Sequence, residues 1–153
     1  MGAGPAVSDT AMVVGVDPGP AERFGCVLLT TYVDRMPDVV VLPYDALDGW
    51  LSVVELVALE RFVIGHGTVR RTRGGTAATL ECIAHVHDVT ARAGTRLLEL
   101  PAGIVKPWAT DERLALWGLT IKGDHHRDAT RHALFAAVRT GLLPRNPEHL
   151  GKV

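Results

Sequence analysis

The first half of this chain is dominated by short apolar runs that Pro or Gly interrupts. Runs of about four to eight residues, rich in Val, Leu and Ile, are typical of β-strands, and nearly continuous ones indicate strands buried on both faces. A turn at Pro18 and Gly19 follows the first run, so we expect the first two strands to form a hairpin. The strands predicted by this pattern are residues 13–17, 25–32, 38–42, 56–64 and 96–100.

Other apolar residues recur at the spacing of a helical face. Positions 47, 50, 51 and 54 are apolar, and this i, i+3, i+4, i+7 pattern predicts a helix. Thr76 and Thr110 are expected as N-caps of later helices, whereas the segment through Pro107 is expected to be a connection. The predicted helices are residues 46–54, 77–93, 111–119 and 124–143.

The resulting order of elements is β-β-β-α-β-α-β-α-α. Strands that pair through short connections, followed by strands linked by helices, predict an α/β fold with one mixed five-stranded sheet flanked by helices. At 153 residues the chain is long enough for one domain with a sizeable core. We expect this domain at residues 13–143, after a flexible leader at 1–12 and before a tail at 144–153.

Composition narrows the class of protein. Hydrophobic residues make up 47% of the chain and charged residues 22%, which is typical of a globular protein. No apolar run approaches the ~20 residues of a membrane-spanning helix, and the first residues lack the pattern of a secretion signal. Cys26 and Cys82 are the two cysteines, and each has apolar neighbours, so we expect a reducing cytoplasmic location and no disulfide.

The net charge of −1 is distributed unevenly. Residues 1–60 carry two basic and nine acidic side chains, whereas residues 61–153 carry fourteen basic and eight acidic ones. Thirteen of the sixteen basic residues are arginine, the side chain best suited to bidentate contacts with phosphate. A codon bias towards arginine explains the excess equally well, so composition alone leaves a nucleic-acid partner open.

Acidic and imidazole side chains stand at three places where a purely structural domain does not need them. Asp17 ends the first apolar run, and Glu60 lies inside another. Asp124, His125 and Asp128 open the last predicted helix, where spacings of three and four residues place them on one face. Each carboxylate also has a structural alternative, with Asp17 as a turn former, Asp124 as an N-cap and Glu60 as a solvent-facing residue at the sheet rim.

Taken together, these groups predict a metal site. Carboxylates on adjacent strands, with a carboxylate and a histidine from a helix packed beside them, can converge on a divalent cation. Oxygen ligands suit Mg²⁺ and Mn²⁺. One or two such ions would activate water and stabilise the leaving oxygen in phosphodiester cleavage. The joint pattern therefore favours phosphodiester hydrolysis more strongly than any single residue does.

Three segments resemble motifs of the RuvC-type Holliday-junction resolvases, which have the ribonuclease-H-like fold. They are Val14-Gly15-Val16-Asp17-Pro18-Gly19, Ala58-Leu59-Glu60-Arg61-Phe62 and His125-His126-Arg127-Asp128-Ala129. Their order and spacing cover most of the chain, which looks most similar to a compact phage-type member. The resemblance implies Mg²⁺ or Mn²⁺ as cofactor, with catalytic metal ligands at Asp17, Glu60, His125 and Asp128 and an extra acid at Asp124.

The resemblance also implies contacts with DNA. Lys106 follows the fifth expected strand, where the family has a lysine that is a candidate phosphate contact. The family often places an aromatic wedge three residues after the glutamate, but here Val63 holds that position and Phe62 precedes it. The glycine-rich loop at 66–75 adds three arginines, which either grip phosphates or are incidental to a solvated loop: Arg70, Arg71 and Arg73.

The expected function is Mg²⁺-dependent resolution of four-way DNA junctions by paired symmetric cuts. Two symmetric cuts require a two-fold homodimer, and the helices at 77–93 and 111–119 are the expected interface. Two alternatives stay open, namely a related ribonuclease-H-like nuclease acting on flaps, forks or RNA, and a catalytically inactive DNA-binding module. No membrane partner is expected, and a phage-encoded protein would act in the host cytoplasm.

Overall fold

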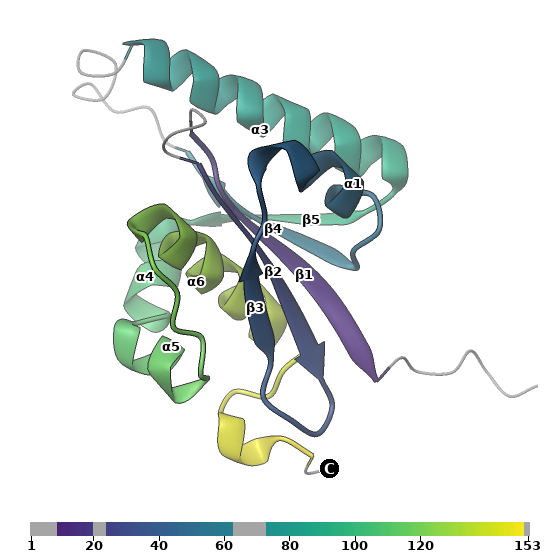
Figure 1. Cartoon of the computed structure of the whole chain (residues 1–153), viewed down its shortest axis with the longest axis vertical. Coiled ribbons are helices and arrows are strands. Elements are labelled where there is room, and N and C mark those ends of the chain that lie inside the picture. The colour runs from purple at the N-terminus through teal and green to yellow at the C-terminus, as the bar shows by residue number, and fades with distance from the viewer. Residues whose placement is uncertain (1–8, 20–23, 63–72, 152–153) are drawn as a thin grey trace, which may run out of the picture.

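A mixed five-stranded sheet forms the centre of the molecule (Figure 1). The computed structural model describes residues 9–19, 24–62 and 73–151. The strand order is β3-β2-β1-β4-β5, in which β1, β2 and β3 pair antiparallel and β4 and β5 continue parallel to β1. The strands are β1 (Thr10–Asp17), β2 (Gly25–Tyr32), β3 (Asp38–Val41), β4 (Leu56–Arg61) and β5 (Arg96–Pro101). The predicted mixed sheet of five strands is therefore confirmed.

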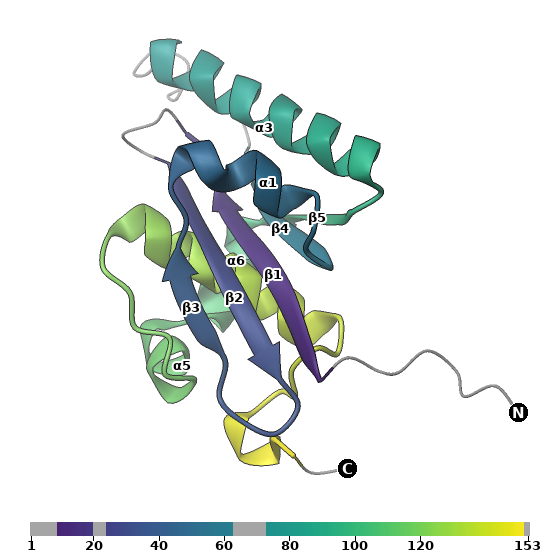
Figure 2. The same cartoon turned by 45° about the vertical axis from the view of Figure 1, so that its right-hand side comes forward.

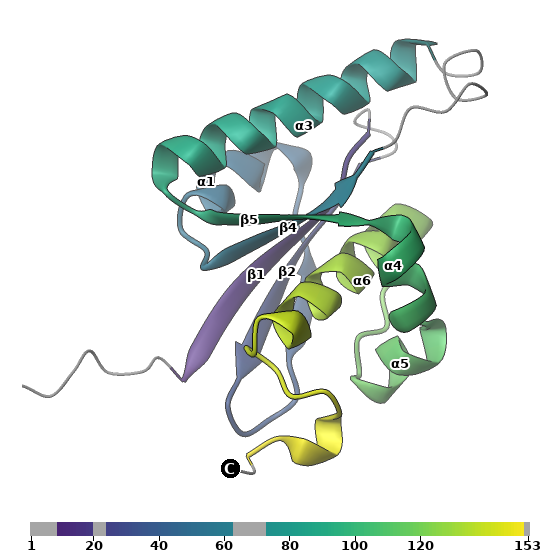
Figure 3. The ribbon, with the colours of Figure 1, turned by 180° about the vertical axis from the view of Figure 1, so that it is seen from behind.

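Helices cover both faces of this sheet. The 3₁₀ helix η2 (Tyr44–Ala46) leads into α1 (Leu47–Leu51), which packs with α3 (Arg73–Ala93) over one face (Figure 2). The opposite face carries the other three α-helices, as the view from behind shows (Figure 3). These are α4 (Ala102–Trp108), α5 (Asp111–Leu116) and α6 (Asp124–Arg139). Among the described residues, no helix combines the length and the apolar character needed to cross a membrane.

Side chains along β1 and β4 point alternately to the two faces of the sheet, and this alternation decides which helices each side chain meets. Val13 of β1 belongs to the apolar cluster beneath α6, whereas Val14 and Val16 belong to the cluster beneath α1 and α3. Because successive side chains of a strand point to opposite faces, Asp17 falls on the α6 face. Ala58 of β4 also belongs to the α6 cluster, so Glu60, two residues later, falls on that same face. The strand period thus puts both carboxylates opposite the last helix.

Two glycines let α6 lie directly on the sheet. A Cβ atom at Gly15 would overlap the backbone oxygen of Ala129, and one at Gly25 would overlap the backbone oxygen of His125. Only a residue without a side chain permits backbone to approach backbone this closely. Gly25 pairs with Asp17 across the β1–β2 ladder, so the close approach lies beside the first carboxylate. The glycines therefore set how near the first turn of α6 comes to Asp17.

The helix α4 was not expected from the sequence. Pro107 made this segment look like a connection, but the proline lies in the last turn of α4, and the helix ends one residue later. A proline disrupts mainly the turn before it, by removing one hydrogen bond and crowding one carbonyl. The helix also follows β5 directly, with Pro101 as its N-cap residue. Lys106 is therefore held on a helix rather than on a loop.

Helix ends differ from expectation in both directions. Thr110 caps α5, since its side-chain oxygen accepts from the backbone N–H of Arg113. Thr76 is not a cap, because α3 already begins at Arg73. The helix expected at 46–54 is split into η2 and α1, and the helices expected to end at 119 and 143 end at Leu116 and Arg139.

Both ends of the expected domain also carry structure. Strand β1 starts at Thr10, so its first residues take up the end of the segment expected as a leader. In the expected tail, residues Pro147–His149 form the 3₁₀ helix η3. The backbone N–H of Gly151 donates to the carbonyl of Val33, which ties this segment to the end of β2. The connection between β2 and β3 therefore contacts a residue beyond 143.

Candidate active site

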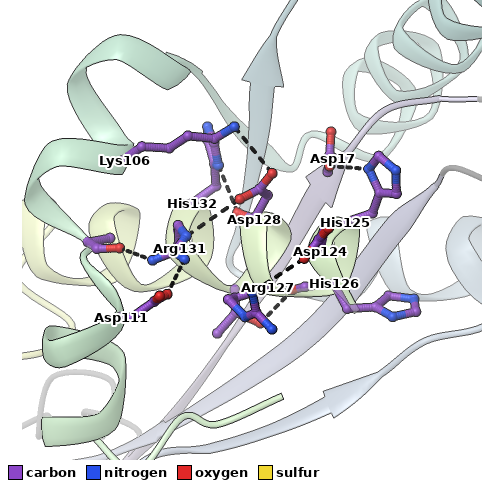
Figure 4. A network of polar contacts seen from close by, with 12 residues as sticks. Asp17, Lys106, Asp111, Asp124, His125, His126, Arg127, Asp128, Arg131 and His132 are labelled. Atoms are coloured by element: carbon purple, nitrogen blue, oxygen red, sulfur yellow. Dashed lines mark hydrogen bonds and ion pairs between the residues drawn. The ribbon is translucent and has the colours of Figure 1, made fainter. Parts of the chain in front are cut away.

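Asp17 at the end of β1 and His125 and Asp128 at the start of α6 lie near one another (Figure 4). Asp17 is the last residue of β1 and is 8% exposed. Its Oδ2 atom lies 2.9 Å from Nδ1 of His125, in the first turn of α6. This contact is possible because Gly25 lets that turn approach the sheet. The first carboxylate and the histidine of the expected site are thus direct neighbours.

Glu60 lies beside Asp17 on the neighbouring strand. In the parallel β1–β4 ladder Val16 pairs with Leu59, so the next residue of each strand is the carboxylate. Burial, a hydrogen bond with Glu60, and the negative charges of Glu60 and Asp128 together raise the pKa of Asp17 to about 9, against the opposing effect of Lys106. Burial first, and the neighbouring carboxylates second, therefore make Asp17 hard to ionise.

Asp128 is the third carboxylate of this cluster, and two cations flank it. Its Oδ2 atom lies 3.2 Å from Nζ of Lys106 on α4, and its Oδ1 atom lies 3.4 Å from Nε of Arg131, one turn further along α6. Burial alone would lower the pKa of Lys106, but the Asp128 carboxylate outweighs it and the pKa is raised. Lys106 therefore stays charged beside the three acids.

Asp124 does not join this cluster. Its side chain is 89% exposed, and its carboxylate lies 3.3 Å from Nη1 of Arg127. It also does not cap α6, whose N-cap residue is Gly123 with a φ of 94°. As an acid in the first turn, it interacts favourably with the positive end of the helix dipole. Of the two residues between which the sequence left the choice open, His125 is the one that contacts Asp17.

A hollow of about 410 Å³ adjoins the carboxylates. Its lining combines the ends of β1, β4 and the start of α4, and Phe62 is part of it. Phe62 is half-buried and lines the hollow together with Asp17 and Glu60. Of the other expected DNA contacts, Lys106 is 47% exposed at its side chain. Arg70, Arg71 and the side chain of Arg73 lie outside the described residues, as does Val63.

The donor set fits a hard divalent cation. Asp17, Glu60 and Asp128 offer carboxylate oxygens and His125 offers a ring nitrogen, a combination suited to Mg²⁺ or Mn²⁺. A bound cation would offset both the burial of Asp17 and the repulsion from Glu60 and Asp128 that together raise its pKa. Within the described residues, no three His, Cys, Asp or Glu side chains lie close enough together, as they stand, to hold a metal ion. Of these carboxylates, Asp128 pairs with Lys106 and Arg131 instead.

Three residues that shape this site were missed in the sequence. Gly15 and Gly25 lie in ordinary strand patterns. The one signal in the sequence is a glycine within a run of β-branched residues, which can mark a place where another backbone segment comes close to the strand. Arg131 follows Asp128 by three residues, a spacing at which opposite charges meet on one helix face. That spacing was visible, but it predicts a surface ion pair, whereas the side chain of Arg131 is only 12% exposed.

Solved structures of known proteins share this fold. A structure of Thermus thermophilus RuvC in complex with a Holliday junction substrate aligns with a TM-score of 0.55 and 17% sequence identity, over 90% of this chain and 99% of that one. A second T. thermophilus RuvC structure aligns with a TM-score of 0.52 and 19% identity, over 85% and 96% of the two chains. No protein-family model matches the chain, and no curated protein sequence does. The likeness to RuvC nevertheless shows the architecture, and this chain has the ribonuclease-H-like fold of the RuvC-type resolvases.

Proposed function

We propose that this protein is a Mg²⁺-dependent endonuclease that resolves four-way DNA junctions by paired symmetric cuts. The observation that carries the proposal is the convergence of Asp17, Glu60, Asp128 and His125 at one edge of a RuvC-like fold. The four residues come from two strands and a helix that are far apart in the sequence. A purely structural role explains Asp17 poorly, because a buried carboxyl group beside two other carboxylates costs stability.

Each side chain has a distinct role in this proposal. Asp17, Glu60, Asp128 and His125 would hold Mg²⁺ or Mn²⁺, and Asp124 stays outside this set because it faces solvent. The bound cation would supply the activation of water and the stabilisation of charge on the leaving oxygen. Lys106 would bind the phosphate next to the cleaved bond, since it is cationic, half exposed and adjacent to Asp128.

The proposal extends to the assembly and its partner. A four-way junction is cut on two strands of like polarity, so two copies of this site are needed and a two-fold homodimer supplies them. The helices α3 and α5 remain the proposed interface. The basic half of the chain, including Arg70, Arg71 and Arg73, would contact the DNA backbone. Two buried free cysteines agree with action in a reducing cytoplasm.

Cleavage mapping on all strands of a defined junction tests the proposed function. The purified chain is incubated with Mg²⁺ and a four-way junction, a flap, a replication fork or an RNA–DNA hybrid of matched sequence. Paired nicks at symmetric positions on two junction strands are expected. Preferential cutting of the flap, fork or hybrid would assign the site to another nuclease of the same fold. Tight junction binding without Mn²⁺ uptake in calorimetry would identify an inactive DNA-binding module.

A further inference from the structure

Arg131 occupies an unusual place for an arginine on a helix. Its side chain is 12% exposed and contacts three groups on different elements. The guanidinium donates to the backbone oxygen of Ala109 and to the carboxylate of Asp111, at the corner between α4 and α5. Its Nε lies 3.4 Å from Oδ1 of Asp128 (Figure 4). One buried side chain thus joins the α4–α5 corner to the carboxylate of the candidate site.

The backbone around Asp128 is also fixed. His132 is fully buried, and its Nδ1 atom lies 2.9 Å from the backbone oxygen of Asp128. A carbonyl oxygen only accepts, so Nδ1 carries the proton and donates it. On the sheet side, the next residue, Ala129, rests against Gly15. Asp128 therefore has little freedom other than rotation of its own carboxylate.

The two cations on Asp128 differ in how easily they can leave. Lys106, which faces Oδ2, is 47% exposed and makes no other ion pair among the described residues. Arg131, which faces Oδ1, is held by two further acceptors and cannot swing away without losing both. A buried guanidinium in several hydrogen bonds is a fixed group, whereas a lysine at the surface is an exchangeable one.

We propose that Arg131 is a positioning residue that holds Oδ1 of Asp128 and thereby presents Oδ2 alone to a divalent cation. Lys106 pairs with Oδ2 in the protein without metal or DNA, and it turns towards a DNA phosphate when the junction or the cation binds. Asp128 would then bind the cation through one oxygen, and its carboxylate would already be held in one orientation before the cation arrives. This inference rests on the proposed function, because it takes Asp128 as a metal ligand.

The substitution Arg131→Lys tests this role while keeping the charge. A lysine cannot hold Ala109, Asp111 and Asp128 at once, so the carboxylate regains its rotation. We expect the dissociation constant for Mn²⁺, measured by calorimetry without DNA, to rise roughly three- to tenfold, the effect of freeing one or two side-chain rotamers. We expect kcat for junction cleavage to fall, with the KM for DNA unchanged. Arg92→Lys is the matched control, because Arg92 forms an exposed helix pair with Asp88 at 2.7 Å.

The outcomes separate this role from its alternatives. Unchanged Mn²⁺ affinity in Arg131→Lys would overturn it. A lower melting temperature together with weaker binding of both Mn²⁺ and, without metal, the junction would also overturn it. That result would show that Arg131 only supports the fold. The variant Asp111→Asn keeps Arg131 but removes one of its anchors, and we expect a smaller weakening of Mn²⁺ binding. If the unaltered protein binds Mn²⁺ but cuts no junction, the proposed function fails while the calorimetric difference still supports the role of Arg131.

Discussion

Nδ1 of His125 lies 2.9 Å from Oδ2 of Asp17, although the two residues are 108 positions apart in the chain. This contact joins the first turn of α6 to the last residue of β1. It exists because Gly15 and Gly25 remove the side chains that would keep the helix off the sheet. The candidate site therefore depends on how closely α6 packs against the sheet.

Asp17→Asn should stabilise the metal-free protein while removing a metal ligand. The pKa of Asp17 is raised from 3.8 to about 9, so the folded protein keeps a proton that the unfolded chain releases. The stability of the unaltered protein therefore falls as pH rises from about 4 towards 9, by up to ~1.4 kcal/mol per pH unit. Asparagine does not titrate, so the gain from the substitution should grow across that range.

Urea unfolding in EDTA at several pH values measures this difference. Near pH 4 the two proteins should be nearly equal in stability, and at pH 8 the variant should be more stable. An advantage that does not change with pH would show that the carboxyl group of Asp17 is not held protonated by its neighbours. Adding Mg²⁺ should stabilise the unaltered protein alone.

Gly15→Ala and Gly25→Ala should each displace α6. The added Cβ would overlap a backbone oxygen of that helix, and such overpacking costs about 1–3 kcal/mol. Either change should lower the melting temperature and abolish cleavage, because His125 and Asp128 move away from β1. Gly49→Ala is the control, since nothing lies within 4 Å of a Cβ there and alanine is the better helix former. Normal cleavage by Gly15→Ala would contradict the close contact between α6 and the sheet.

Lys106→Gln should weaken junction binding through one lost phosphate contact. The raised pKa of Lys106 keeps it cationic, so removing it should reduce the salt dependence of binding by about one unit of slope. Fluorescence titrations of a junction at increasing salt measure that slope in the absence of Mg²⁺. Arg92→Gln removes a charge that pairs with Asp88 and should leave the slope unaltered. An unchanged slope in Lys106→Gln would exclude a phosphate contact.

Much of the site could be predicted because strands have a period of two. Once residues 13–17 and 56–64 are taken as neighbouring strands, Asp17 and Glu60 can meet, and the structure pairs the residues just before them, Val16 and Leu59. The last helix was recognisable from its spacing, and His125 and Asp128 share the face that meets the sheet. The mixed character of the sheet followed from which connections are short and which contain helices.

The remaining features depend on contacts that no local pattern encodes. Pro107 hid α4, because a proline is compatible with a helix that ends immediately after it. Glycines at 74 and 75 hid the start of α3, because they are poor helix formers. The burial of Arg131 depends on the α4–α5 corner, which forms only in the folded protein. Tertiary packing, rather than propensity, decides all three.

The comparison of Glu60→Gln with the unaltered protein on one four-way junction decides whether the carboxylate cluster is the site of cleavage. The substitution keeps the size of the side chain and removes a carboxylate charge beside Asp17. Junction affinity is measured in EDTA, and cleavage is mapped on all four strands in Mg²⁺. We predict that the unaltered protein makes paired symmetric nicks, and that Glu60→Gln binds the junction as tightly but cuts it at least a hundredfold more slowly, about 2.7 kcal/mol of lost transition-state stabilisation. Paired nicks at an undiminished rate in Glu60→Gln would contradict the account.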